Sequence, residues 1–574
     1  MKYPFQDSLP KQPVPSLEKT CEYYLQMLAP LLNETDLART KEQVKIFQQQ
    51  IGPQLQQQLE TIAASTQTSY IYNFLHNRLL EHQSSLFHQN FSSVLMLDSS
   101  NNNVPFAKFV AGWIVSLLRF YLKIKQGEFA PNDDVRRKPF GIHEYLKFFG
   151  QTRIPGVECD TLQQASASKH IVVIRRNVFY LLTLLNSDVL PNIADIAQQI
   201  NWILEQSVTG EPAIGLLTSM NRERWMRLRS HLVAYDSKNS STLDIIDNAL
   251  FVVCLDESIP PHIEATTKNA LYSDGGNRWF DKSLQLIFTP DNQLALNIEH
   301  AELDGYPTLR FFADVNQYYQ QLEDEQTTTF PGIYPKPLQW NLSDEILKTI
   351  KQAEENAKNL IDNYEMRVLE IKEFGRRFIA KQQLHADALV QLSLQLTYFR
   401  LYGKMVSSYE PIAMGHFRYG RVEGIRSVTA ESLQLMKTLT ENIPNNNKWQ
   451  ALKKANDTHV SLLANIMNGK TGGDRYLFAL HSLARQQGIK PDIFMDKVYR
   501  EIFSKSPLST TSLPNLSLDC LINFHPEVAD GYAIFYSIKP DKIYFTITSQ
   551  QQEIDKFVDL LKLSLSELVN LKSQ

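Results

Sequence analysis

The stretch from residue 283 to residue 305 holds the side chains best suited to chemistry: a histidine at position 300 and a carboxylate four residues later, at Asp304. An imidazole has a pKa near neutrality, so a histidine can accept and return a proton at physiological pH. A strand pattern runs into His300 and a glycine follows Asp304, so this histidine could be held rigidly at the mouth of a cleft. The alternative is that His300, one of 13 histidines, is a surface or satisfied core residue.

The segments around His300 have the patterns of an α/β domain. Residues 284–288 and 294–298 are apolar or alternating around the turn signal Thr-Pro-Asp-Asn, which predicts a β-hairpin. The segments 170–183 and 249–257 are rich in Val, Ile, Leu and Phe and predict further strands, with helical periodicity between them. We therefore expect a mixed sheet flanked by helices around the histidine.

The chain as a whole divides into two halves. Helical patterns dominate the first 90 residues. Residues 326–340 contain three prolines and a glycine without periodicity, which is typical of a linker. Beyond it, long helices and three apolar strands, at 519–524, 532–538 and 542–549, predict a second α/β half. Two such halves of similar size favour a cleft between them.

Size, charge and cysteine content limit the class of protein. A chain of 574 residues exceeds what one hydrophobic core usually supports, so two domains are expected. A net charge of −4 gives no electrostatic reason to expect nucleic acid as a partner. The four cysteines are scattered and form neither a metal nor a disulfide pattern. No signal peptide and no apolar stretch of membrane-spanning length is visible, so a soluble, cytoplasmic protein is the expectation.

Ten short motifs resemble those of the carnitine/choline O-acyltransferase family and occur in that family's order over nearly the whole chain. The first six are LPKQPVPSLEKTCEYYL, RIPGVECDTL, STLDIIDNALFVVCLDE, GGNRWFDKSLQLIF, EHAELDG and PKPLQW. The other four are LQLTYFRLYG, YEPIAMGHFRYGRVEGIRS, DRYLFAL and LSTTSLP. Each motif alone is weak, but ten in one order are specific.

The resemblance implies two related α/β domains of mixed β-sheet flanked by helices, similar to chloramphenicol acetyltransferase, with an active-site tunnel at the domain interface. It implies a helical segment over residues 1–90 that packs partly on the second domain, a first domain over 91–330 and a second over 331–574. The implied reaction is reversible transfer of a short acyl group between coenzyme A and the hydroxyl of a small acceptor. Coenzyme A would be a co-substrate, with no permanently bound cofactor. We expect a monomer that binds neither nucleic acid nor membrane.

In this family the histidine that His300 matches is the general base for the acceptor hydroxyl. Asp304 stands where the family has Glu or Asp; it balances charge or contacts an arginine, or it only caps the turn before Gly305. Ser509 and Thr511 match the outer positions of the family's Ser-Thr-Ser run and would donate hydrogen bonds to the transition-state oxyanion. No third ligand for a metal beside His300 is evident, and the family uses none.

The identity of the acceptor is less settled. In carnitine enzymes a tyrosine, a threonine and an arginine hold the carboxylate; Tyr409 and Arg475 match two of them, but Val422 replaces the threonine, as in choline enzymes. A buried guanidinium without an anionic partner is costly, so we give Arg475 more weight and favour carnitine. Phe524 matches an aromatic near the trimethylammonium group. The alternatives are choline, another small hydroxylated acceptor, or a catalytically silent binding relative.

The segment KEFGRRFIAKQQ matches the family's site for the 3′-phosphate of coenzyme A. Arg376 occupies a lysine position of that site, Lys381 lies next to a second one, and Asp387 follows; the alternative is an ordinary charged helix face. Ile522 stands where short-chain enzymes have a bulky residue and long-chain enzymes have glycine. A branched side chain there would fill the acyl channel, so the sequence predicts acetyl or another short acyl group.

Overall fold

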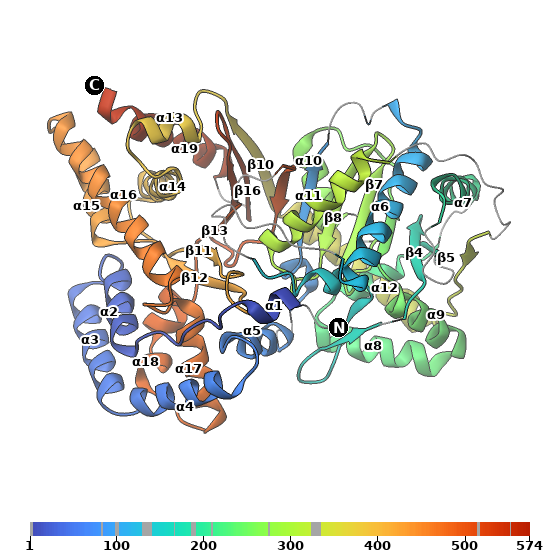
Figure 1. The fold of residues 1–574 in the computed structure, drawn as a ribbon, viewed down its shortest axis with the longest axis horizontal. Helices are drawn as coiled ribbons and strands as arrows, with labels where there is room; N and C mark the ends of the chain where they lie inside the picture. Colours follow the sequence, from blue (N-terminus) through green and yellow to red (C-terminus); the bar gives the residue numbers. More distant parts are fainter. Residues whose placement is uncertain are drawn as a thin grey trace.

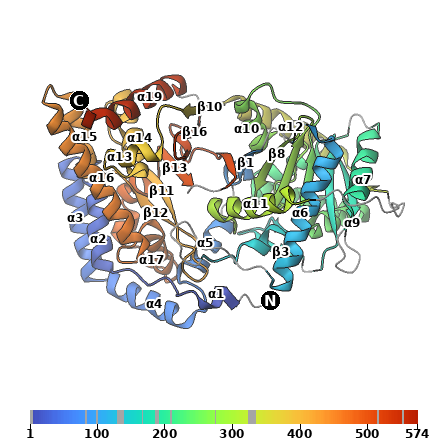
Figure 2. The same ribbon diagram turned by 45° about the horizontal axis from the view of Figure 1, so that its top comes forward.

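Two halves lie side by side, each built on a mixed β-sheet with helices against its faces (Figures 1 and 2). The computed structural model describes residues 4–81, 84–97, 101, 103–128, 140–165, 167–184, 191–207, 211–273, 276–322, 334–513, 517–550 and 553–573. The expected fold class, α/β with two mixed sheets flanked by helices, is confirmed.

The first sheet has eight strands in the order β14-β1-β8-β7-β6-β4-β5-β9. Their bounds are β1 (Phe91–Met96), β4 (His170–Arg175), β5 (Val178–Thr183), β6 (Val252–Leu255), β7 (Leu284–Thr289), β8 (Gln293–Ile298), β9 (Lys336–Pro337) and β14 (Asp519–Asn523). β7, β6 and β4 run parallel, and the strands on either side of them pair antiparallel. The predicted hairpin is confirmed as β7 and β8, with Asn292 at φ 61° in its turn. A separate small hairpin joins β2 (Gln151–Ile154) and β3 (Thr161–Gln164).

The second sheet has six strands in the order β10-β16-β15-β13-β11-β12. Their bounds are β10 (Tyr364–Ile371), β11 (Ser408–Ala413), β12 (Val422–Arg426), β13 (Leu508–Leu513), β15 (Tyr532–Ile538) and β16 (Ile543–Gln550). From β16 to β12 the pairings are antiparallel, parallel, parallel and antiparallel. The first sheet has the same four pairings from β8 to β5, so the two halves repeat one plan.

Strand β14 joins the halves. Between β13 and β15 the chain leaves the second sheet and adds β14 to the edge of the first, where Ile522 lies opposite Ser93 of β1. The apolar pattern of the sequence groups β14 with the two strands that follow it. Its partner is β1 instead, because the pairing of a strand depends on tertiary contacts that periodicity does not reveal.

The helices cover both sheets. In the first half they are α6 (Phe106–Gln126), α7 (Ile193–Glu205), α8 (Arg222–Tyr235), α9 (Ser237–Asn248), α10 (Ile263–Tyr272), α11 (Gly305–Gln320) and α12 (Asp344–Asp362). In the second they are α13 (Arg376–Lys381), α14 (Ala386–Tyr402), α15 (Ala430–Thr440), α16 (Asn445–Met467), α17 (Asp474–Gln486), α18 (Asp492–Met495), the π-helical turn η5 (Val498–Phe503) and α19 (Ile554–Asn570). Short 3₁₀ turns are η1 (Leu86–His88), η3 (Tyr145–Phe148), η4 (Ile214–Ser219) and η6 (Leu571–Ser573).

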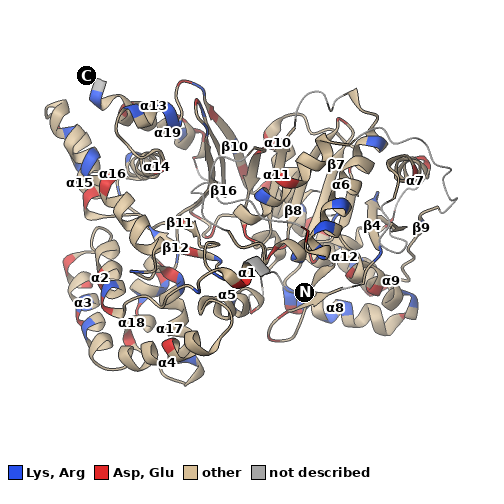
Figure 3. Cartoon of the chain, viewed as in Figure 1, with Lys and Arg blue, Asp and Glu red and all other residues tan. Residues whose placement is uncertain are grey.

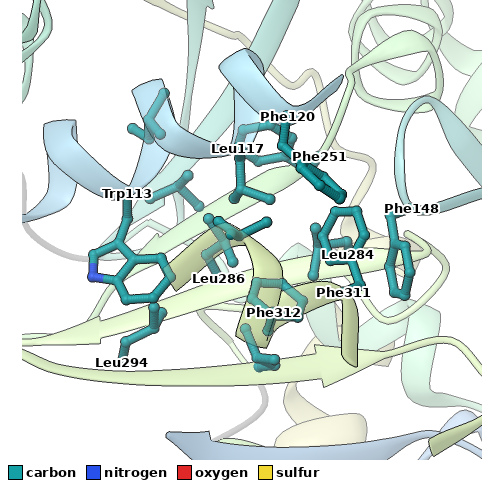
Figure 4. Close-up of a cluster of buried hydrophobic side chains, with 14 of the residues drawn as sticks. Trp113, Leu117, Phe120, Phe148, Phe251, Leu284, Leu286, Leu294, Phe311 and Phe312 are labelled. Atoms are coloured by element: carbon teal, nitrogen blue, oxygen red, sulfur yellow. The ribbon is translucent and has the colours of Figure 1, made fainter. Parts of the chain in front are cut away.

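The first core forms where α6 and α11 pack on the hairpin that leads to His300. Figure 4 shows Trp113, Leu117 and Phe120 of α6 over the hairpin side chains, with Phe311 and Phe312 of α11 beside them. All of these side chains are fully buried. Burial of large apolar side chains contributes about 1.5–3 kcal/mol each, so the end of β8 rests on a rigid base.

The N-terminal helices α1 (Pro4–Ser8), α2 (Leu17–Leu28), α3 (Glu34–Gln49), α4 (Gly52–Ser65) and α5 (Ile71–Leu80) precede the first sheet. Helices α4 and α5 pack on α17, and α3 packs on α18. β9 and α12 follow residue 330 in the chain, yet they pack with the first sheet. Of the predicted linker, residues 326–333 lie outside the described residues. The expected domain limits at 90 and 330 stay predictions.

A buried ionic network fixes the loops under His300. Arg153 donates to Asp160 (2.6 Å) and to Glu299 (3.0 Å), which directly precedes His300. Arg222 donates to the same Asp160 (2.7 Å) and to Asp281 (2.6 Å). All five ionic side chains of this network, two arginines and three carboxylates, are almost completely buried. Because two guanidiniums share three carboxylates, the charges largely compensate one another.

Charges on the outside are mixed in sign. Blue and red positions are interspersed over the outer helices of both halves (Figure 3). Within the described residues, no helix combines the length and apolar character needed to cross a bilayer.

We predict that Arg222→Met lowers the free energy of unfolding by about 3–5 kcal/mol, because it leaves the carboxylate of Asp281 buried without its partner. Urea unfolding followed by circular dichroism measures this change. Arg227→Met is the control, because Arg227 forms an exposed pair with Glu223 on the same helix, and its loss should change stability little. Equal stabilities of the two variants would contradict a structural role for the network.

Candidate active site

A cavity of about 870 Å³ lies between the two halves and collects most of the residues singled out from the sequence. Nine of them line it: His300, Asp304, Tyr409, Val422, Arg475, Ser509, Thr511, Ile522 and Phe524. They come from the loop after β8, from β11, β12, β13 and β14, and from the first turn of α17. Residues more than 200 positions apart in the sequence therefore face one space.

His300 is held in one tautomer by its own loop. Its Nδ1 lies 2.6 Å from the carbonyl oxygen of Leu303, which can only accept, so Nδ1 carries the proton. Nε2 is then the nitrogen with the free lone pair. The side chain is 37% exposed, and its ring meets Phe91 edge-on at 5.1 Å between centroids. Desolvation in the cavity lowers the pKa of His300, while the charge of Asp304 raises it and that of Arg421 lowers it.

Asp304 contacts an arginine, as one of the two expectations proposed. Arg421 donates to both carboxylate oxygens, from Nε to Oδ2 at 3.1 Å and from Nη2 to Oδ1 at 2.8 Å. A third bond runs from Nη1 of Arg421 to the carbonyl oxygen of Ala301 at 2.6 Å. Burial raises the pKa of Asp304, but the charge of Arg421 and its hydrogen bonds hold that pKa below its ordinary value. Asp304 also precedes α11 as its N-cap residue, without a capping bond from its side chain.

Arg421 lies just before β12, so this ion pair crosses from the second half to the first. Asp304 and Arg421 are each only 2% exposed, and Oδ1 of Asp304 is 3.9 Å from Nδ1 of His300. The carbonyl of Leu303 and the carboxylate of Asp304 therefore lie on the same side of the imidazole ring. Together they stabilise the proton on Nδ1 and the cation that forms when Nε2 takes up a second proton.

Ser509 and Thr511 project from β13 toward the first half. Side chains alternate along a strand, and Leu513, which shares their parity, belongs to the core of the first half. Thr510 points the other way: its hydroxyl donates to the carbonyl of Tyr409 at 2.7 Å and accepts from Gln391 at 2.8 Å. The two outer hydroxyls thus face the cavity, while the middle one holds the sheet together.

Tyr409 and Arg475 meet at one end of the cavity. Nη2 of Arg475 donates to the Tyr409 hydroxyl at 3.0 Å, and its buried Nε has no partner among the described residues. The backbone amide of Arg475 donates to Glu423 at 2.7 Å, which fixes the start of α17. Gly424 follows Glu423 in β12, and a Cβ at this glycine would come within 2.5 Å of the Tyr409 ring. Only a glycine permits the ring to lie this close to β12.

Val422 has an apolar side chain on the same face of the sheet. β11 and β12 pair antiparallel, with Tyr409 opposite Arg426 and Ala413 opposite Val422. Arg426 is neutralised by Asp474 at 2.6 Å, and its guanidinium also lies 5.3 Å from the centre of the Tyr409 ring. Of the two neighbouring guanidiniums, Arg475 is therefore the one that lacks a carboxylate partner among the described residues.

Ile522 and Phe524 reach the cavity through β14. Ile522 is 3% exposed and packs into the first core, and Phe524 packs against the same core. β1 separates β14 from β8, so these side chains lie two strands from the strand that leads to His300.

The three residues expected to bind coenzyme A lie elsewhere. Arg376 and Asp387 line a second cavity of about 240 Å³, and Lys381 lines neither cavity. Both cavities share lining residues, namely Tyr306, Pro411, Ala413, Ser512 and Leu513. The two spaces are therefore neighbours, separated by side chains of β11, β13 and α11. That they form one tunnel stays a prediction.

Asp387 belongs to a buried group of three. His459 lies 3.7 Å from Asp387 and 3.4 Å from Glu410, and these are the described residues close enough to share a metal ion. Burial and the negative charge of Asp387 raise the pKa of Glu410 well above its ordinary value. The neutral form of Glu410 is therefore favoured beside the carboxylate of Asp387. The expectation of no metal stays a prediction.

Sequence reasoning missed Arg421, Arg426 and Arg78. Arg421 and Arg426 stand inside the motif YEPIAMGHFRYGRVEGIRS, one directly before β12 and one at its end, and this pair of arginines around a short strand was the available signal. Arg78 also lines the large cavity, but it comes from α5, in a segment whose sequence indicates only an amphipathic helix. Nothing in its local pattern links it to the site.

Comparison with known proteins places these residues in context. A family model described as choline/carnitine O-acyltransferase matches residues 12–563. The chain is 30% identical to the carnitine O-acetyltransferase of Homo sapiens, over 95% of this chain and 90% of that protein. It is 29% identical to the mitochondrial carnitine O-palmitoyltransferase 2 of Bos taurus, over 98% of this chain and 92% of that protein. Among solved structures, the trichothecene 15-O-acetyltransferase of Fusarium sporotrichioides is 10% identical, with a TM-score of 0.37 over 87% of this chain and 93% of that one.

These relatives correct one expectation. The cytoplasmic location expected from the sequence is contradicted, because the matched palmitoyltransferases of Bos taurus and Homo sapiens are named as mitochondrial proteins.

We predict that the acid limb of the pH profile of kcat/KM lies below pH 6.5, because the pKa of His300 is lowered from 6.5 and the neutral form is the base. Asp304→Asn removes the charge that raises this pKa, so the limb moves to lower pH. Arg421→Gln removes the charge that lowers it, so the limb moves to higher pH. Shifts in the same direction, or none, would contradict the coupling among the three residues.

Proposed function

Because the chain belongs to the choline/carnitine O-acyltransferase family, we propose that it transfers a short acyl group, such as acetyl, reversibly between coenzyme A and the hydroxyl of carnitine. One observation carries the choice of acceptor: the Arg475 guanidinium, with its unpartnered Nε, lines the same cavity as His300. A carboxylate is the ligand that such a guanidinium binds best. Carnitine supplies a carboxylate and a hydroxyl on one small molecule.

His300 acts as the general base. Its Nε2 takes the proton of the carnitine hydroxyl while that oxygen attacks the thioester carbonyl carbon of acyl-coenzyme A. The Leu303 carbonyl accepts from Nδ1, and the carboxylate of Asp304 stabilises the imidazolium that forms. When the tetrahedral intermediate collapses, the carbon–sulfur bond breaks and Nε2 returns the proton to the departing thiolate. The acyl ester and free coenzyme A result, and the same steps run in reverse.

Ser509 and Thr511 stabilise the intermediate. Attack on the thioester places a negative charge on its oxygen, and a hydroxyl donor fixed in advance is worth more there than in water. Both hydroxyls are on the face of β13 that lines the cavity. Threonine can make the same hydrogen bond as the serine that the family carries at position 511. The trimethylammonium of the acceptor adds a positive charge close to the oxyanion, and Phe524 offers its ring to that cation.

Choline is the alternative acceptor, and Val422 favours it. An isopropyl group cannot donate to a carboxylate, so one of the three contacts expected in a carnitine enzyme is missing. Choline itself has no anion for Arg475. Loss of this hydrogen bond costs about 0.5–1.5 kcal/mol in binding free energy. Leaving a desolvated guanidinium without an anion costs more, so the comparison supports carnitine.

Ile522 supports a short acyl chain. The side chain is almost completely buried in the first core and lines the cavity, so it occupies space that a long chain would need. Arg376 and Asp387, at the neighbouring cavity, are the residues proposed to bind the coenzyme A end, with Lys381 close by on α13. The donor and the acceptor would then reach His300 from different sides.

Release of free thiol from acetyl-coenzyme A tests the function, measured with carnitine, with choline and with neither. We expect release only with carnitine, and His300→Ala should lower kcat by about a hundred- to ten-thousandfold. Arg475→Asn should raise the KM for carnitine about tenfold or more and leave that for acetyl-coenzyme A nearly unchanged. Release with choline alone would overturn the role of Arg475. No release with either acceptor would favour a silent relative.

Acyl-chain length is tested separately. We predict that the wild type uses acetyl-coenzyme A in preference to palmitoyl-coenzyme A, and that Ile522→Gly raises the ratio of palmitoyl to acetyl kcat/KM by about tenfold or more, because the glycine opens the channel. The control is Ile522→Val, because it keeps most of the side chain. Ile534→Gly would not serve as a control, since it would damage the second core. Efficient use of the palmitoyl donor by the wild type would contradict a blocked channel.

A further inference from the structure

Arg78 lines the same large cavity as Arg475. Arg78 is on α5, which packs on α17. Its guanidinium carbon lies 4.6 Å above the centre of the Phe478 ring, and Phe478 is three residues after Arg475 on α17. Residues three apart share one helix face, so the ring on which Arg78 stacks lies about one helical turn along α17 from Arg475. Stacking on the ring leaves the N–H edges of Arg78 free to donate.

Neither guanidinium has a carboxylate partner within the described part of the chain. Arg475 bonds the neutral hydroxyl of Tyr409, and Arg78 forms no ion pair or hydrogen bond with a described side chain. Asp474, the closest acid on α17, is already bound by Arg426 at 2.6 Å. Desolvation lowers the pKa of Arg78, and so does the nearby charge of Arg475. Two like charges that repel each other in a cavity wall are stabilised by an anion between them.

Because Val422 cannot donate a hydrogen bond, a second guanidinium can serve as hydrogen-bond donor to the acceptor. The apolar side chain of Val422 leaves the acceptor's carboxylate without a donor on the β12 side. A carboxylate has two oxygens and accepts about four hydrogen bonds, which is more than Arg475 and Tyr409 supply together. Arg78 of α5, which stacks on Phe478 about one helical turn along α17 from Arg475, can supply the rest.

We propose that Arg78 is a second receptor for the anionic group of the acceptor, so that Arg475 and Arg78 bind one carboxylate from two sides. The inference rests on the proposed function and names its substrate class: hydroxylated acceptors that carry an anion. α5, a helix of the N-terminal segment, then contributes directly to acceptor specificity. A neutral acceptor gains nothing from Arg78, and a purely cationic acceptor is repelled by it.

The test compares Arg78→Gln with the wild type in the thiol-release assay. Because a charge-assisted hydrogen bond is lost, we expect the KM for carnitine to rise about tenfold. The value of kcat and the KM for acetyl-coenzyme A should stay within about twofold, because Arg78 touches neither the base nor the donor. Arg78→Lys keeps the charge and should recover part of the affinity. In a double variant with Arg475→Asn, the two effects should combine to less than their product, because both side chains hold one group.

Arg500→Gln is the matched comparison, since Arg500 is an exposed arginine at the same cavity but does not stack on Phe478. An equal rise of KM in this variant would mean diffuse attraction and would overturn the assignment of Arg78. An unchanged KM in Arg78→Gln, with carnitine-dependent turnover intact in the wild type, would overturn the inference and leave the proposed function standing. Absence of carnitine-dependent turnover in the wild type itself would overturn both.

Discussion

A carboxylate from one half of the molecule and a guanidinium from the other, Asp304 and Arg421, meet in a space from which water is excluded. Desolvating two charges is costly, and their mutual attraction offsets this cost only when the contact geometry is close. The two hydrogen bonds to the carboxylate and the third to the carbonyl of Ala301 provide that geometry. Arg421 leads into β12, and Asp304 closes the loop of His300. The ion pair therefore holds the loop of His300 against the start of β12, and its two charges shift the pKa of His300 in opposite directions.

The two sheets share one plan of pairings, but they contribute different parts of the site. The strand β8 ends in the loop of His300, whereas its counterpart β16 ends at Gln550, which only lines the cavity. The crossovers differ as well. In the first sheet α10 connects β6 to β7; in the second, the chain from β13 to β15 passes through β14 in the first sheet. This exchange places Ile522 two strands from β8, so a residue of the second half lines the cavity from the first sheet.

The local sequence pattern predicted much of the fold, but it did not predict features that depend on contacts between distant parts of the chain. The turn at Asn292 and the strands of the hairpin follow from short-range preferences and are confirmed. The pairing partner of β14 does not follow from short-range preferences, because any apolar strand can pair with any free sheet edge. The resemblance named His300 and Arg475, but the partner of Asp304 and the position of Arg78 depend on contacts across more than 100 residues. Such contacts leave no trace in local spacing.

The proposed choice of acceptor depends on charge in the cavity wall more than on His300, since a general base accepts a proton from any hydroxyl of suitable position. Arg426 is neutralised by Asp474, but Arg475 and Arg78 are not neutralised by any described residue. Replacing a donor by Val422 forfeits one hydrogen bond, about 1 kcal/mol, while a cationic acceptor would add a third positive charge to two that already repel. An acceptor that brings its own anion removes this repulsion. The balance of these two effects, rather than the identity of residue 422 alone, supports the proposal that the acceptor is a zwitterion such as carnitine.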